Sequence, residues 1–135
     1  MTRVLITLAS LGVLASFALT LLWGLKARWN ENMRRAVAIG YHRRWARRTF
    51  AVVVAAVLLV EAAVRLGAYR GMGSGSGFVF HWVHLPAAAA GFLLLVAMHF
   101  RYTGVRYPRF HKWLAYPCLA SFGIAGVTGV GLAWV

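Results

Sequence analysis

Four long apolar stretches alternate with short basic connections along this chain of 135 residues. The stretches cover about residues 4–25, 49–67, 78–100 and 113–135. Each is close to the length of about 20 residues that a helix needs to cross the hydrocarbon core of a bilayer. Inside a bilayer an open chain can satisfy its backbone polar groups only as a helix. The pattern therefore predicts an all-α membrane protein, a single domain (1–135) built as a bundle of four transmembrane helices.

Composition supports this class of protein and argues against a soluble one. Hydrophobic residues make up 61% of the chain and charged residues 13%, whereas soluble domains average about 25% charged residues. A net charge of +13 would also suit a nucleic-acid-binding protein. The bases flank the apolar stretches, however, so we expect contact with membrane lipids and no contact with nucleic acid.

The distribution of lysine and arginine predicts an orientation. The first and third connections hold twelve of the fifteen bases. Because short basic loops stay in the cytoplasm, we expect loops 1 and 3 to be cytoplasmic and both termini to lie outside. The expected location is a bacterial-type cytoplasmic membrane.

The first two connections carry different patterns. In the first, large side chains recur every four residues at Trp29, Met33, Val37, Tyr41 and Trp45. This spacing predicts either a short interfacial helix over residues 31–47 or an extension of the second helix into the cytoplasm. In the second connection, GMGSGSG (71–77) is predicted to be a flexible linker.

Three histidines are expected at the cytoplasmic ends of three different helices. His42 precedes the second stretch, His99 ends the third and His111 precedes the fourth. Neutral imidazoles from separate helices can ligate a transition metal or supply the axial ligands of haem. Alternatively, each histidine binds lipid phosphate or a loop carbonyl.

A second polar group is expected near the outer face. His81 and His84 are three residues apart in the third stretch, on one side of a helix. Glu61 lies within the second stretch, where a carboxylate is costly unless it is paired. Glu61, His81 and His84 are therefore candidate ligands of an outer metal site. Alternatively, Glu61 pairs with Arg65 one helical turn away.

The remaining chemistry is sparse. The chain has no aspartate, two glutamates and a single cysteine, Cys118, which excludes an internal disulfide. It also lacks a glycine-rich phosphate loop and a Ser/His/Asp set. We assign no catalytic residue and expect a binding protein rather than an enzyme.

Short motifs resemble those of a known family. They are HRRWARRTF from His42, His84 followed by LPAA, and HKWLA from His111, followed later by Thr128-Gly129 in VTGV. From residue 40 onward the chain resembles the four-helix membrane proteins that include CtaM (YozB), an assembly factor of haem-copper oxidases. The resemblance implies a role in maturing a respiratory oxidase by handling haem or copper, with His42, His84 and His111 as the histidines of interest. Glu61 and Arg65 stand where the resemblance leads us to expect one more histidine.

These observations predict a histidine-rich membrane protein that binds haem b, copper or another transition metal. It would support assembly of, or electron transfer in, a respiratory haem-copper oxidase, which would be its membrane-protein partner. One alternative is a b-type cytochrome acting as an electron-transfer subunit. Another is a structural accessory subunit of a larger complex with no cofactor of its own.

Overall fold

Every regular element in the described part of the chain is helical. The computed structural model describes residues 2–29, 32–65, 74–101, 103 and 106–134. Its elements are α1 (Thr2–Trp29), α2 (Asn32–Arg65), α3 (Ser74–Val79), η1 (Phe80–His84), α4 (Leu85–Val96), η2 (Ala97–Arg101) and α5 (Pro108–Trp134). The elements from α3 to η2 follow one another without a break, so that they form one long helix with two π-helical turns. The described chain therefore contains four long helices and no strand, as the apolar pattern predicts.

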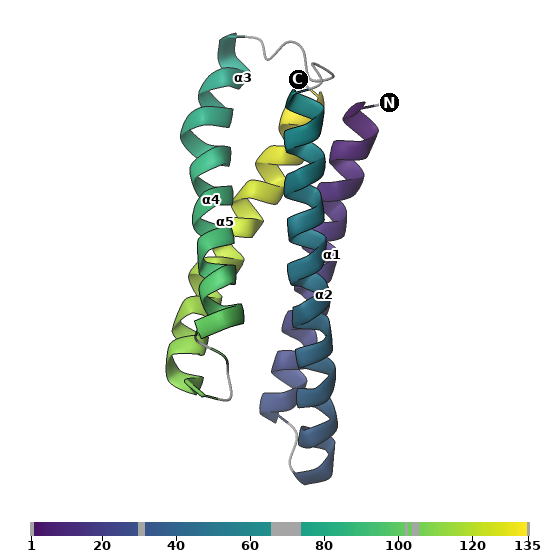
Figure 1. The fold of residues 1–135 in the computed structure, drawn as a ribbon, viewed down its shortest axis with the longest axis vertical. Coiled ribbons are helices and arrows are strands. Elements are labelled where there is room, and N and C mark those ends of the chain that lie inside the picture. The colour runs from purple at the N-terminus through teal and green to yellow at the C-terminus, as the bar shows by residue number, and fades with distance from the viewer. Residues whose placement is uncertain (1, 30–31, 66–73, 102, 104–105, 135) are drawn as a thin grey trace.

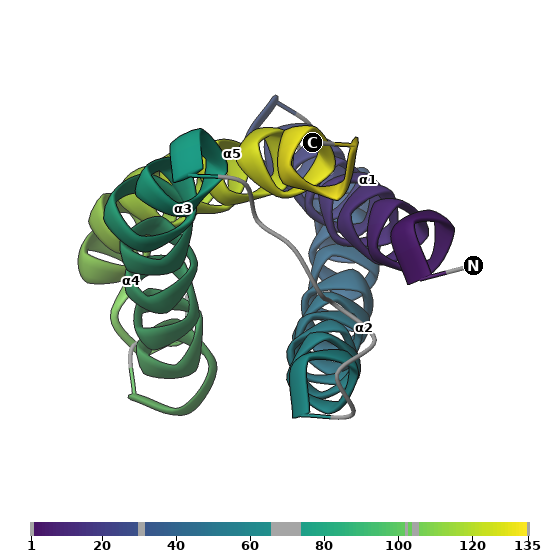
Figure 2. The same ribbon diagram turned by 90° about the horizontal axis from the view of Figure 1, so that it is seen from above.

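The four helices form an open arc (Figures 1 and 2). Seen along the helices, α5 and α1 occupy the middle of the arc, and α4 and α2 form its two arms. α1 packs most extensively on α2 and α5, while α2 meets α4 and η2 over a short stretch only. The start of α1 and the end of α5 lie at the same end of the bundle. At the opposite end, the hairpin of α1 and α2 reaches beyond the other helices.

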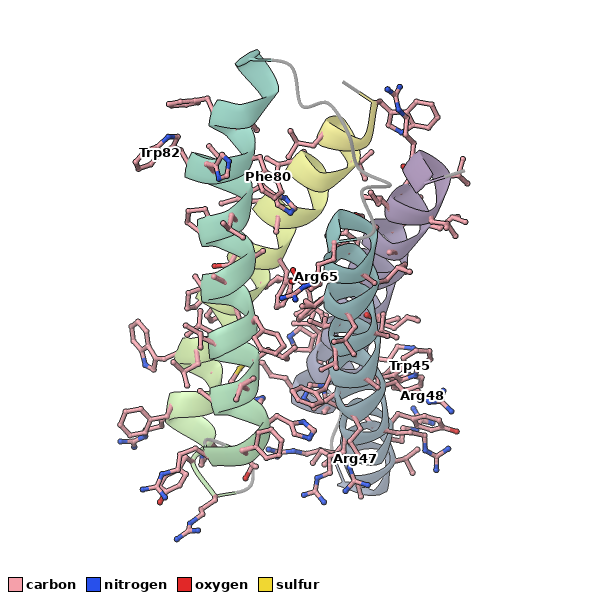
Figure 3. All side chains as sticks on the ribbon, turned by 45° about the horizontal axis from the view of Figure 1, so that its top comes forward. Trp45, Arg47, Arg48, Arg65, Phe80 and Trp82 are labelled. Carbon is pink, nitrogen blue, oxygen red and sulfur yellow. The ribbon has the colours of Figure 1, made fainter. Side chains whose placement is uncertain are left out.

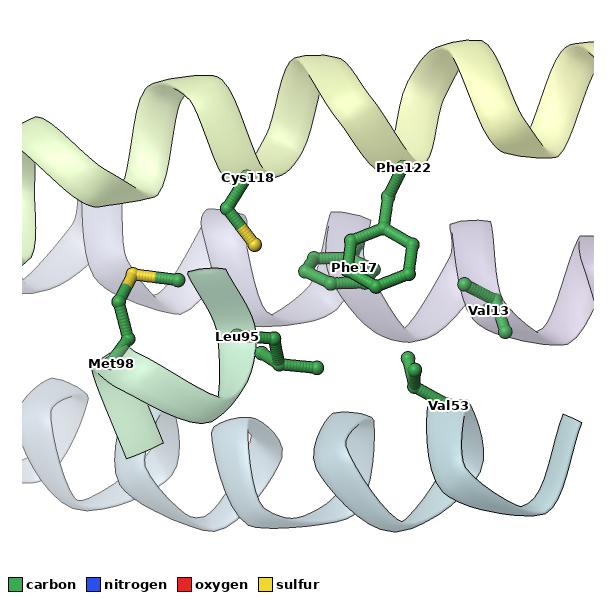
Figure 4. Packing of buried hydrophobic residues seen from close by; sticks show 7 residues of the cluster. All are labelled: Val13, Phe17, Val53, Leu95, Met98, Cys118 and Phe122. Carbon is green, nitrogen blue, oxygen red and sulfur yellow. The ribbon is translucent and has the colours of Figure 1, made fainter. Parts of the chain in front are cut away.

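A core of seven buried residues joins all four helices (Figure 4). Its members are Val13 and Phe17 of α1, Val53 of α2, Leu95 of α4, Met98 of η2, and Cys118 and Phe122 of α5. The rings of Phe17 and Phe122 lie 4.5 Å apart between centroids. Cys118 is fully buried, as expected for a small apolar residue.

Glycines allow close packing of α4 on α5 and of α5 on α1. A Cβ at Gly91 of α4 would lie 3.1 Å from the ring of Phe122. A Cβ at Gly126 of α5 would lie 2.7 Å from Leu14 of α1. Close approach at small residues is how membrane helices pack without a hydrophobic drive between them.

The outer surface of the bundle is strongly apolar. Trp82 is 73% exposed and Leu93 is 68% exposed, with many other large apolar side chains around them. Three helices are long and apolar enough to cross a membrane: Arg3–Trp29, Gly77–Arg101 and Pro108–Leu132. These features indicate that the protein associates with a membrane and that lipid covers the apolar surface.

Helix α2 does not meet that criterion because its apolar part is short. Only Thr49–Val64 lies between the flanking arginines, and it includes Glu61. That segment rises roughly 24 Å, less than the hydrocarbon core of about 30 Å. The second predicted span, within α2, is therefore the least apolar of the four.

Two predictions for the connections need correction. The interfacial helix in the first loop is wrong, because α2 runs unbroken from Asn32, as the alternative of an extended second helix predicts. The apolar side of the extension packs on α1: Ala38 is 3% exposed, and the ring of Tyr41 stacks on Trp23 at 4.5 Å. The flexible linker is also partly wrong, because residues 74–77 begin α3, which lies against α5. The rest of that linker, 71–73, lies outside the described residues.

Candidate functional site

The three histidines predicted at the cytoplasmic boundary lie at one end of the bundle. The rings of His42 (α2) and His111 (α5) meet nearly at right angles, with their centroids 6.2 Å apart. His99 (η2) stacks on Phe50, two helical turns further along α2, with a centroid distance of 4.3 Å. All three are half-buried. The antiparallel packing of the helices thus brings the three histidines to the same end of the bundle, with His99 two helical turns of α2 away from the His42–His111 pair.

Two features of α1 hold the imidazole of His42. Its Nδ1 lies 2.9 Å from the backbone oxygen of Thr20. Gly24, one turn later, leaves room for the ring, because a Cβ there would lie 3.2 Å from that same Nδ1. A carbonyl oxygen only accepts hydrogen bonds, so in the neutral ring Nδ1 carries the proton and Nε2 keeps its lone pair. This is the way in which second-shell carbonyls orient metal-binding histidines.

A buried hydroxyl network holds α1 and α2 in this register. Thr49, which is fully buried, lies 2.8 Å from the hydroxyl of Thr20 and 3.0 Å from the carbonyl oxygen of Ser16. The Thr20 hydroxyl also lies 2.9 Å from that carbonyl. Each hydroxyl has one proton to donate, so two of these three contacts are hydrogen bonds at any one time. Both threonine hydroxyls therefore have an acceptor in an otherwise apolar interface. The network therefore fixes the position of α2 along α1, and with it the position of the His42 ring beside the Thr20 carbonyl.

The separation of His42 and His111 suits a metal centre shared by two imidazoles. Metal–imidazole bonds of about 2.0 Å on opposite sides of one ion bring the ring centres a little more than about 6 Å apart. The observed 6.2 Å, with ring planes at 87°, agrees with that requirement. The donor set, two neutral imidazoles, is also the one used for axial ligation of haem and for copper. The two residues therefore have the donor type and the ring separation that either group would require of its protein ligands.

His99 belongs to an aromatic cluster. Besides stacking on Phe50, its ring meets Phe100 edge-on at 4.8 Å, and Phe100 meets Phe50 at 5.6 Å. Over residues 2–29, 32–65, 74–101, 103 and 106–134, no three His, Cys, Asp or Glu side chains lie close enough to hold a metal ion. The structure thus brings together His42 and His111 but does not complete a three-histidine group with His99.

The residues predicted for an outer metal site have separate partners. Glu61 Oε1 lies 2.6 Å from Nε of Arg65, as the alternative interpretation predicts. Both side chains are well exposed, at 55% and 78%, and Arg65 extends from α2 into the space facing α4 (Figure 3). His81 is exposed and meets Phe80 edge-on. Glu61, His81 and His84 are thus not assembled into one site in this structure.

His84 is held in the same way as His42, by an oxygen and a glycine of a neighbouring helix; each such arrangement is called a histidine seat below. Its Nδ1 lies 3.0 Å from Oγ1 of Thr128 on α5. That hydroxyl donates its single proton to the carbonyl oxygen of Ile124 at 2.7 Å. Nδ1 of His84 must therefore be the donor, which leaves the lone pair on Nε2. Gly129 makes room for the ring, since a Cβ there would lie 3.1 Å from Cε1 of His84.

Sequence reasoning singles out the histidines but misses most of their supports. Thr128-Gly129 is only a short motif in the sequence, and the structure places it against His84. Thr20 and Gly24 give no signal, because single threonines and glycines are common in membrane helices. Their roles depend on contacts between residues far apart in the chain.

No family model, curated protein or solved structure matches this chain. The geometry of the two histidine seats is therefore the basis on which a function can be assigned.

Proposed function

We propose that this chain is an integral membrane protein that holds one haem or transition-metal centre between His42 and His111. The observation that carries the proposal is the close pair of imidazoles, with ring centroids 6.2 Å apart, one of them held by a hydrogen bond from Nδ1 to the backbone oxygen of Thr20. Its role is to support assembly of, or electron transfer in, a respiratory haem-copper oxidase. The resemblance of the motifs around His42, His84 and His111 to those of CtaM-like proteins favours that role.

In this proposal all four long helices cross a bacterial-type cytoplasmic membrane. Both termini and the α2–α3 connection face outward, and the basic connections face the cytoplasm. The short apolar part of α2 is supported by its contact with α1 and by the mutual pairing of Glu61 and Arg65 near the outer surface. The ion pair lowers the cost of placing two charged groups near lipid.

Each residue of the site has a distinct task in the proposal. His42 and His111 hold the metal through ring nitrogens, and the Thr20 carbonyl keeps His42 in the required tautomer. When bound, haem iron or copper supplies one-electron redox chemistry, or is itself the cargo delivered to the oxidase.

The visible spectrum and metal content of the purified protein test the proposal. We expect either a Soret band or bound copper, iron or zinc in elemental analysis. His42→Ala and His111→Ala should each abolish that signal, whereas His81→Ala, at an exposed histidine outside the pair, should retain it. A protein with neither pigment nor metal after expression with haem and copper supplied would end the proposal.

A structural accessory role is the second candidate. The observation that favours it is the large exposed apolar surface on the arms of the arc, which includes Leu58 at 64% and Leu93 at 68% exposure. This role predicts that the His42→Ala/His111→Ala double variant leaves the yield and activity of the partner complex unchanged. A b-type cytochrome is distinguished by redox turnover, because only that role requires reduction of the bound centre by a quinol analogue.

A further inference from the structure

The end of the bundle that holds the His42–His111 pair carries a large excess of positive charge. Twelve of the fifteen lysines and arginines lie there. They are Lys26, Arg28, Arg34, Arg35, Arg43, Arg44, Arg47, Arg48, Arg101, Arg106, Arg109 and Lys112. The acid that the sequence places at this end, Glu31, lies outside the described residues, and Glu61 is paired with Arg65 at the other end. The histidine pair therefore lies in a strongly positive field.

Some of these cations face aromatic rings, while others are exposed close to the histidines. Lys26 lies over Trp23, Arg44 over Tyr41 and Arg48 over Trp45, at 4.6, 5.8 and 5.0 Å from the ring centroids. Figure 3 shows Trp45 and Arg48 on the side of α2 that faces away from α4.

Two exposed cations directly follow the paired histidines. Arg43 follows His42 on α2, and Lys112 follows His111 on α5. Lys112 also lines an open hollow together with Trp113 and Tyr116. Each histidine of the pair is thus followed on its helix by an exposed cation, whose side chain leaves the helix about 100° around the axis from the imidazole.

This field discriminates between the two kinds of ligand that the imidazoles could bind. A free metal ion adds positive charge, and two neutral imidazoles bring no negative charge to offset it. A porphyrin with carboxylate groups brings the metal together with two negative charges. Guanidinium groups bind carboxylates through paired, charge-assisted hydrogen bonds, and lysine contributes a point charge.

We infer that the ligand of the His42–His111 pair is a metalloporphyrin with free carboxylates, which Arg43 and Lys112 bind, rather than a free metal ion. The inference rests on the proposed function, because it takes the histidine pair as the metal-binding group. It assigns to the cations a task beyond orientation in the membrane: they select the ligand by its charge.

Spectral titration of the full-length protein in lipid nanodiscs of neutral lipid tests the inference. The probes are iron protoporphyrin IX, its dimethyl ester, in which both carboxylates are neutral, and zinc ion. We expect the free acid to bind at least about tenfold more tightly than the ester. Zinc should bind far more weakly than the free acid.

Matched variants separate the neighbouring cations from the general charge of the protein. Arg43→Gln combined with Lys112→Gln should weaken binding of the free acid about tenfold and leave binding of the ester unchanged. Arg34→Gln combined with Arg35→Gln removes the same charge about two turns before His42 and should leave both affinities within about twofold. Arg43→Lys keeps the positive charge and should retain most of the affinity. Unchanged binding of the ester by the double glutamine variant shows that its loss of affinity for the free acid is not caused by misfolding.

The outcomes separate this inference from the proposed function. Equal affinity for the acid and the ester, or tight zinc binding without porphyrin binding, overturns the inference and leaves a metal-binding histidine pair. Equal losses in the two double glutamine variants also overturn it, because the effect is then one of net charge. Absence of binding of all three probes overturns the proposed function itself.

Discussion

Replacing Gly24 with alanine should weaken ligand binding while leaving the bundle folded. The added Cβ would lie 3.2 Å from Nδ1 and 3.3 Å from Cε1 of His42, closer than the about 3.5–4.0 Å of ordinary contact. The ring must move away by a few tenths of an ångström. The 2.9 Å hydrogen bond from Nδ1 to the Thr20 carbonyl then lengthens, and the ring changes its position relative to His111.

Two effects of similar size act on stability in opposite directions. Losing the hydrogen bond costs about 1 kcal/mol, while alanine favours a helix interior over glycine by about 1 kcal/mol. The free energy of unfolding should therefore change by less than about 1 kcal/mol. The helix propensity of alanine does not offset the loss of ligand affinity. A loss of about 1–1.4 kcal/mol in binding free energy weakens binding roughly fivefold to tenfold.

Gly12 provides the matched control on the same helix. A Cβ at Gly12 would meet nothing within 4 Å, so Gly12→Ala gains helix propensity without touching His42. Spectral titration with the bound chromophore measures affinity, and thermal unfolding in detergent followed by circular dichroism measures stability. If Gly24→Ala binds as tightly as the wild type, or if Gly12→Ala weakens binding equally, the reasoning about the His42 seat is refuted.

Three further predictions concern the packing around the site. Thr49→Val removes a fully buried hydroxyl that bridges α1 and α2, and it should destabilise the protein by about 0.5–2 kcal/mol in thermal unfolding; an unchanged midpoint would contradict the hydroxyl network. Gly129→Ala should lower the unfolding midpoint, since its Cβ would lie 3.1 Å from His84, whereas Gly131→Ala, with nothing within 4 Å, should not; equal shifts would argue against the seat. Cys118 is 0% exposed, so a maleimide should label it only after unfolding, and rapid labelling of the native protein would place the core elsewhere.

The helices, and the end of the bundle at which the three histidines lie, could be predicted because their signals are local. A run of apolar residues such as 78–100 specifies a membrane helix wherever it occurs. The positions of His42, His99 and His111 at helix ends then result from the alternating direction of successive helices. The structure agrees for His99 and His111, which lie near the ends of η2 and α5. His42 instead lies ten residues inside α2, because that helix begins at Asn32, as one of the two alternatives for the recurring aromatic residues predicts.

The partners of the polar side chains could be predicted only where they are also local. Glu61 and Arg65 are four residues apart, and the ion pair that this spacing allows is the one that forms. The partner of His42 is Thr20, 22 positions away in the chain, and its identity depends on the register of α1 against α2. That register is set by small residues and by the buried Thr49, which no periodicity reveals.

The two histidine seats share one construction but differ in what the histidine faces. In both, Nδ1 is held by an oxygen of a neighbouring helix and a glycine makes room for the ring. His42 faces a second imidazole, His111, within a field of cations. The ring of His84 instead stacks on Phe80 at 5.6 Å, and no second histidine faces it among the described contacts. Of the three histidines implied by the resemblance, His42 and His111 therefore form a pair and His84 stands apart. His42 and His111 form the ligand-binding pair of our proposal, and His84 joins η1 to α5 so that the far end of the arc keeps its shape.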